Sequence, residues 1–127
     1  MAYIYYNPNP DRVIVGDCVI RGISLLMDRS WEEIYISICN EGLFMHDMPS
    51  SNEVWGSFLL KNGYIRKIIP NVCPECYTIK EFCADYPYGK FLLATGTHVV
   101  AVKNGNYYDT WDSGNEIPIY YFKKEEI

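Results

Sequence analysis

The dipeptide Asn104-Gly105 constrains the fold of this chain more than any other feature, because it separates two runs rich in β-branched and aromatic residues. A type I′ turn needs positive φ at both central positions, which Asn and Gly tolerate, so the pair predicts a two-residue β-hairpin loop. Counting outward from the turn places His98 opposite Trp111 and puts Asp109 on the same face of the sheet as His98. A histidine and a carboxylate are therefore expected to be diagonal neighbours across the hairpin.

Helical and strand-like patterns divide the rest of the chain. Capping-box patterns predict two of the helix starts, at Ser30 and at Thr78. Four helices are expected, at about 17–28, from 30 to about 40 with a stop at Gly42, from 50 or 51 to about 61–63, and from 78 to just before Pro87. Four strands, at 91–95, 97–103, 106–111 and 117–122, are expected to form an antiparallel meander. We therefore predict one α+β domain over residues 1–127, with a helical front (17–86) packed on a β-sheet back (89–122).

Charge and composition exclude several classes of protein. The 127 residues carry a formal net charge of −5, and Lys and Arg are scattered rather than clustered, so nucleic acid is not an expected partner. The start of the chain does not resemble a signal peptide, and no apolar run approaches membrane-spanning length, so no membrane association is expected. Five cysteines, an odd number, do not suggest a disulfide scaffold. We therefore predict a cytoplasmic protein of undetermined oligomeric state, in which the thiols stay reduced.

Cys18 is the candidate nucleophile. The tripeptide Gly16-Asp17-Cys18 ends a polar, turn-rich approach and opens the apolar run of the first predicted helix. The first backbone N–H groups of a helix and the positive end of its dipole favour the thiolate, which is the reactive form of cysteine.

A cysteine nucleophile needs an imidazole to take its proton and a third group to orient that imidazole. The hairpin register supplies both, with His98 as the base and Asp109 as the orienting carboxylate. Asp112 is the alternative, because a three-residue loop would pair it directly with His98 and move Asp109 to the other face. We favour Asp109 because Asn-Gly is typical of the two-residue turn.

The order Cys, His, Asp, with the cysteine opening a helix and the other two residues on a sheet, resembles the papain-like cysteine peptidases. Asp109-Thr110-Trp111 is similar to that family's Asn-Ser-Trp, and the resemblance implies that Trp111 shields the hydrogen bond between the histidine and its partner. Asp17-Cys18 also resembles the small peptidases that process bacteriocin leaders. A papain-like fold and a bacterial or phage origin are what these likenesses imply.

One position departs from the papain-like pattern. The family places a glutamine six residues before the cysteine, where its amide helps to bind the oxyanion, and this chain has Arg12 there. Asn9, and with it Asn7, is the candidate replacement, because a side-chain amide in the loop just upstream could join the Cys18 N–H.

These residues predict a cysteine-dependent hydrolase, a peptidase or amidase, that acts through an acyl-thioester intermediate on a peptide or protein substrate. The triad by itself does not separate hydrolysis from acyl transfer. No metal or other cofactor is required by this chemistry. The alternative is a non-catalytic papain-like module that binds a peptide or protein, which the missing glutamine favours.

The remaining thiols and the second histidine have weaker functional signals. Cys73-Pro74-Glu75-Cys76 has the spacing of a zinc or redox motif, and Cys83 and His46 are further potential ligands, but a second Cys pair at ligand spacing is missing. A loop with incidental thiols is therefore the favoured interpretation, and no metal site is predicted. His46 lies in a loop-like segment and is expected at the surface.

Overall fold

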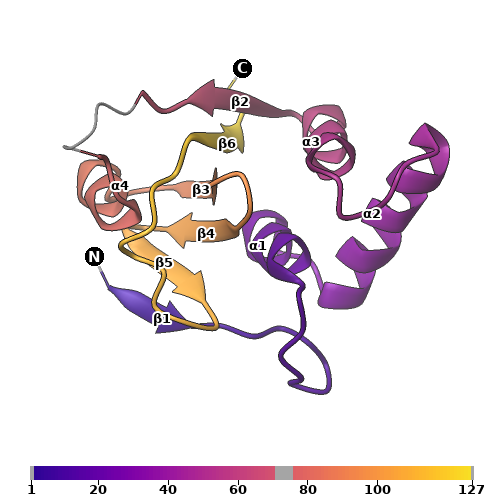
Figure 1. Ribbon diagram of the computed structural model, residues 1–127, viewed down its shortest axis with the longest axis horizontal. Helices are drawn as coiled ribbons and strands as arrows, with labels where there is room; N and C mark the ends of the chain where they lie inside the picture. Colours follow the sequence, from indigo (N-terminus) through magenta and orange to yellow (C-terminus); the bar gives the residue numbers. More distant parts are fainter. Residues whose placement is uncertain (1, 71–75, 127) are drawn as a thin grey trace.

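The computed structural model describes residues 2–70 and 76–126, which form an α+β fold (Figure 1). Within these residues there are four helices and one six-stranded sheet. In chain order the elements are β1 (Tyr3–Tyr5), α1 (Cys18–Met27), α2 (Trp31–Met45), α3 (Asn52–Lys61), β2 (Tyr64–Ile68), α4 (Ile79–Asp85), β3 (Lys90–Ala94), β4 (Val99–Lys103), β5 (Asn106–Asp109) and β6 (Tyr120–Lys124). The predicted fold class, α+β, is confirmed at this level.

The predicted hairpin joins β4 to β5. Lys103 pairs with Asn106, and Asn104 and Gly105 form the two-residue loop with φ of 51° and 76°. The register that the Asn-Gly turn predicts is therefore confirmed. Extended by a few residues from the turn, this register puts Asp109 and His98 on one face of the sheet.

The simple meander that we expected is wrong beyond this hairpin. The strand order is β1-β5-β4-β3-β6-β2, so β6 pairs with β3 and not with β5. Strand β1 pairs in parallel with the edge of β5 that faces away from β4. Residues 110–119 cross back instead of turning, and their carbonyl groups accept from the first N–H groups of α4, Ile79 to Glu116 and Lys80 to Gly114, both at 3.0 Å.

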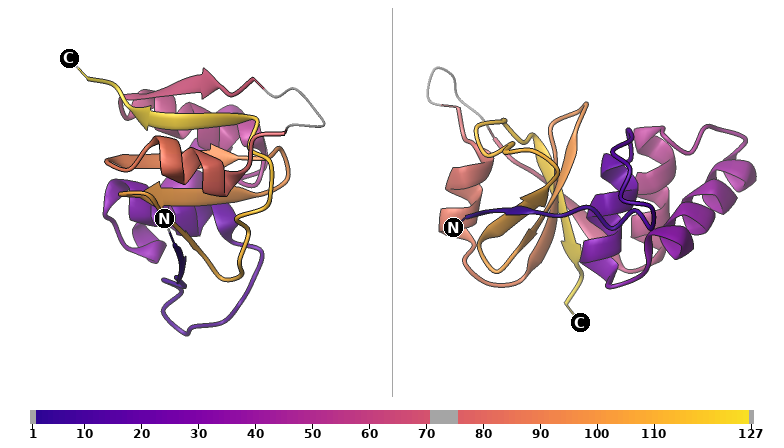
Figure 2. Two further views of the ribbon diagram at one scale, coloured as in Figure 1. Left: turned by 90° about the vertical axis from the view of Figure 1, so that its left-hand side faces the viewer. Right: turned by 90° about the horizontal axis from the view of Figure 1, so that it is seen from below.

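The helices lie on both faces of the sheet, so the expected single helical front is also wrong. Figure 2 shows α1, α2 and α3 on one side of the strands and α4 on the other. Two separate clusters of buried apolar side chains match these layers, one including Ile23, Trp55 and Phe122 and the other including Phe82 and Leu93. The predicted front, residues 17–86, also contains strand β2, which the sequence analysis did not predict.

Helix α1 packs very closely on β3 and β4, and Gly22 permits the approach. A Cβ atom added at Gly22 would lie 2.5 Å from Leu92 Cδ1 and 3.4 Å from Val99 Cγ1. Any larger residue would have to displace the buried Leu92 side chain. This contact fixes the depth at which the start of α1, and with it Cys18, lies against the sheet.

Helix α2 continues through Gly42 to Met45, so the predicted stop at Gly42 is wrong. The glycine serves a tight approach instead, because an added Cβ would lie 2.8 Å from the carbonyl oxygen of Asp47. The helix ends at His46, which is exposed and left-handed with φ of 56°. None of the helices in the described part of the chain is long and apolar enough to cross a membrane.

Candidate active site

Cys18 is the first residue of α1, and its half-buried side chain lies against His98, the residue just before β4. Burial raises the pKa of the Cys18 thiol, but hydrogen bonds from the His98 side chain and the Val99 N–H, with the charges of His98 and Arg21, outweigh it and lower the pKa below its ordinary value. The surroundings of Cys18 therefore favour the thiolate.

His98 contacts both other members of the predicted triad. Its Nε2 lies 2.7 Å from Asp109 Oδ2, which leaves Nδ1 as the ring nitrogen for Cys18. Burial lowers the pKa of His98, but hydrogen bonds with Asp109 and Cys18 raise it further, to about 9. A tight turn fixes the backbone here, since the N–H of His98 donates to Thr95 Oγ1 at 3.1 Å and its carbonyl accepts from the Thr95 N–H at 2.9 Å.

Asp109 is fully buried at the end of β5, and four donors surround its carboxylate. Oδ2 accepts from Ser113 Oγ at 2.7 Å as well as from His98, while Oδ1 accepts from Arg21 Nη2 and the Thr110 N–H, both at 2.8 Å. Burial raises the pKa of Asp109, but the hydrogen bonds from His98 and Ser113 outweigh it and lower the pKa. The carboxylate is therefore held ionised and in one orientation.

Strand β1 holds the main chain of Asp109. The carbonyl oxygen of Asp109 accepts from the Tyr6 N–H at 2.9 Å and from the Tyr3 hydroxyl at 3.2 Å. The chain then runs from Tyr6 round to Cys18, so the first strand connects two members of the site.

Arg21 and Asp17 belong to the same buried network and were missed in the sequence. Arg21 Nη1 donates to Asp17 Oδ1 at 2.5 Å, and Trp31 Nε1 donates to Asp17 Oδ2 at 2.8 Å. Asp17 thus bonds side chains instead of capping the N–H groups of α1. A lone arginine in an apolar helix, four residues after an aspartate, was the available signal.

Trp111 and Asp112 are the other two candidate residues near His98 in the sequence. The Trp111 ring lies 5.1 Å from the His98 ring between centroids, tilted by 37°, and its side chain is half-exposed. Asp112 points elsewhere, because its Oδ1 accepts from the Tyr107 hydroxyl at 2.5 Å and from the Gly114 N–H at 3.2 Å. The structure thus brings Asp109, and not Asp112, to His98.

The structure does not bring the predicted oxyanion donors to Cys18. Asn9 Oδ1 accepts from the Asp11 N–H at 2.9 Å, and Asn7 donates to the Val13 carbonyl at 3.3 Å, so both amides hold their own loop. The Arg12 side chain is exposed, and its backbone is in the left-handed region with φ of 59°. Neither Asn9 nor Asn7 is therefore directed toward Cys18 as a replacement for the glutamine amide.

Backbone groups offer a different donor set. The intrahelical ladder of α1 begins with the N–H of Arg21, which donates to the Asp17 carbonyl at 2.9 Å. The N–H groups of Cys18, Val19 and Ile20 precede that ladder at the helix start. They are suited to stabilise negative charge beside the Cys18 sulfur.

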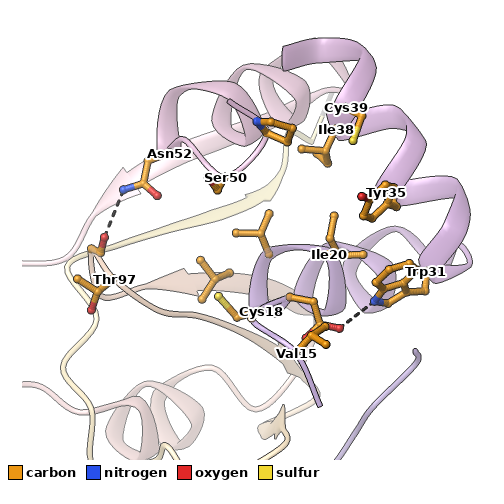
Figure 3. A pocket seen from close by; sticks show the side chains of 16 residues that line it. Val15, Cys18, Ile20, Trp31, Tyr35, Ile38, Cys39, Ser50, Asn52 and Thr97 are labelled. Carbon is orange, nitrogen blue, oxygen red and sulfur yellow. Dashed lines mark hydrogen bonds between the residues drawn. The ribbon is translucent and has the colours of Figure 1, made fainter. Parts of the chain in front are cut away.

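A cleft of about 770 Å³ adjoins Cys18 between α1, α2 and the start of α3 (Figure 3). Its far wall carries Trp31 and Tyr35, whose rings stack with centroids 5.1 Å apart, together with Ile38 and the free thiol of Cys39. The cleft is mainly apolar, is open to solvent and has the size of a binding site for a peptide side chain or a small ligand.

The zinc alternative receives no support from the described residues. No group of three or more His, Cys, Asp or Glu side chains capable of holding a metal occurs among residues 2–70 and 76–126. Cys73 lies outside these residues. Cys76 is bonded in a disulfide, so the expectation that the thiols stay reduced is wrong for this residue, and it offers no free thiolate to a metal. Cys83 is a buried free thiol, and burial raises its pKa to about 11, which makes it unreactive.

No protein-family model, curated protein or solved structure matches this chain. The likeness to papain-like peptidases therefore depends on the short motifs around Cys18 and Asp109. The physical basis for a function is the arrangement of Cys18, His98 and Asp109 beside the cleft.

Proposed function

We propose that this protein is a cysteine-dependent hydrolase of papain-like type, which cleaves an amide bond in a peptide or protein through Cys18, His98 and Asp109. One observation carries the proposal: His98 contacts Cys18 on one side and Asp109, at 2.7 Å, on the other. A nucleophile, a base and a group that orients the base are the minimum that this chemistry needs.

In the first half of the reaction the Cys18 thiolate attacks the carbonyl carbon of the substrate. The tetrahedral oxyanion is stabilised by the Cys18 N–H and its neighbours at the start of α1. As the C–N bond breaks, protonated His98 gives its Nδ1 proton to the leaving amine, and an acyl thioester remains on Cys18. Asp109 keeps the Nε2 proton in place, so that Nδ1 is the nitrogen that exchanges protons.

In the second half, neutral His98 takes a proton from a water molecule, which attacks the thioester carbonyl. The C–S bond breaks, the acid product leaves, and Cys18 and His98 return to the thiolate and imidazolium forms. A reducing compartment such as the cytoplasm would keep Cys18 available for this cycle.

An electrophilic peptide probe that alkylates active-site cysteines tests the proposal. We expect labelling of wild type at neutral pH that disappears in Cys18→Ala and falls sharply in His98→Ala. Cys39→Ala is the matched control, because Cys39 is a free thiol that lines the same cleft, and it should label like wild type. Inert Cys18 in wild type at neutral pH would refute hydrolysis and favour the non-catalytic binding module.

A further inference from the structure

Arg21 joins the two elements that carry the candidate site. It lies one turn after Cys18 on α1, and its side chain is only 6% exposed. Its guanidinium reaches Asp17 with Nη1 and Asp109 with Nη2, at 2.5 and 2.8 Å. Because Asp109 belongs to β5, Arg21 connects the helix that bears the thiol to the strand that bears the orienting carboxylate.

The hydrogen bonds of Asp109 show what Arg21 does there. A carboxylate offers about four acceptor positions, and all four are occupied by His98, Ser113, the Thr110 N–H and Arg21. Arg21 binds the oxygen that His98 does not use. It therefore prevents the carboxylate from turning away from the imidazole.

Charge gives Arg21 a second task. Asp17 and Asp109 are both buried carboxylates, and Arg21 lies between them as their shared counterion. The other titratable groups that face this network are Cys18, His98 and the Tyr3 hydroxyl of β1. Without the guanidinium, the two buried carboxylates would lose their counterion, and the Cys18 thiolate would lose a positive charge that favours it.

We infer that Arg21 is a positioning residue of the proposed hydrolase, which holds Asp109 against His98 and whose charge favours the Cys18 thiolate. This inference rests on the proposed function, because it needs Cys18 to be the nucleophile. Arg21 touches no substrate in this account and acts through Asp109 and Cys18 alone.

The test is the rate of Cys18 alkylation by iodoacetamide between pH 5 and pH 10, followed at the Cys18 peptide by mass spectrometry. In Arg21→Met the midpoint is expected to rise by about one pH unit, so that labelling at a pH below both midpoints falls about tenfold. Arg21→Lys keeps the charge and should move the midpoint less than half as far. Arg29→Met removes an exposed arginine near the end of α1 and should leave the midpoint unchanged.

Near-ultraviolet circular dichroism checks that Arg21→Met is folded. If the folded variant has the wild-type midpoint of Cys18 alkylation, the inference is overturned. An Arg21→Lys midpoint as high as that of Arg21→Met would also overturn it. If Arg21→Met does not fold, the test is the rate at which the His98 Nε2 proton of Arg21→Lys exchanges with water, measured by NMR. We expect about tenfold faster exchange with water, because an ammonium group cannot bridge both carboxylates, and an unchanged rate overturns the inference. Wild-type Cys18 that labels no faster than Cys39 at pH 6 refutes the proposed function itself.

Discussion

Replacing Asp109 by Asn tests the orienting role with almost no change in shape. The Asn amide has only one oxygen, so it must turn its NH2 group toward one pair of the four donors. Arg21 and the Thr110 N–H can only donate, whereas Ser113 and a neutral His98 can also accept. The NH2 group will therefore face His98, and His98 Nε2 will become an acceptor.

The consequence is a reversed tautomer, with the proton on Nδ1 and no free base facing Cys18. A thiol without this help has a pKa of about 8.5 and is only about 1% ionised at pH 6.5, so the largest loss of thiolate is about 100-fold. A thiolate of higher pKa is the stronger nucleophile, which offsets about one power of ten. We therefore expect Asp109→Asn to lower the rate of Cys18 alkylation at pH 6.5 by about tenfold.

Asp112→Asn is the matched control. Both of the donors to Asp112, the Tyr107 hydroxyl and the Gly114 N–H, bind the same oxygen, so an amide can keep both bonds. This variant should alkylate at the wild-type rate, with both proteins shown to be folded by circular dichroism. Wild-type reactivity in Asp109→Asn, or a comparable loss in Asp112→Asn, would refute the assignment of the third residue.

Two further predictions concern the packing of α1 and the pH dependence of the reaction. Gly22→Ala forces a Cβ against Leu92 and should lower the free energy of unfolding in urea by about 1–3 kcal/mol, whereas Gly16→Ala, with nothing within 4 Å of the added Cβ, should change it by less than about 0.5 kcal/mol. Equal effects would contradict the close packing. The pKa of His98 is raised to about 9, so the imidazolium that protonates the leaving amine persists at neutral pH and is lost as the pH rises through about 9. Peptide hydrolysis should therefore fall on the alkaline side near pH 9, and a fall near pH 6.5 would show an unperturbed histidine.

Local chemistry in the sequence was sufficient for the hairpin and for the contact between His98 and Asp109. Asn104-Gly105 has one favoured turn geometry, which fixes the register of β4 and β5 and hence the common face of His98 and Asp109. The capping box at Thr78 is also confirmed, with both of its reciprocal hydrogen bonds to Glu81. Signals of this kind depend on a few neighbouring residues.

Long-range pairing could not be predicted in the same way. Strand β1 is only three residues long and derives its place from the edge of β5, about 100 residues later. The pairing of β6 with β3 depends on the path of residues 110–119, which contact the start of α4. No local sequence pattern predicts that path. The roles of Arg21 and Asp17 were hidden for the same reason, because a buried ion pair is recognised only when its partner from β5 is in place.

An NMR titration of the His98 imidazole tests the central claim, the hydrogen-bonded pair of Cys18 and His98, most directly. The chain has only two histidines, so a His46→Gln variant assigns the signals. We predict that His98 titrates near pH 9 and that its pKa falls in Cys18→Ala, because the hydrogen bond and the charge of Cys18 raise it. A His98 pKa near 6.5 that does not change when Cys18 is removed would contradict the account.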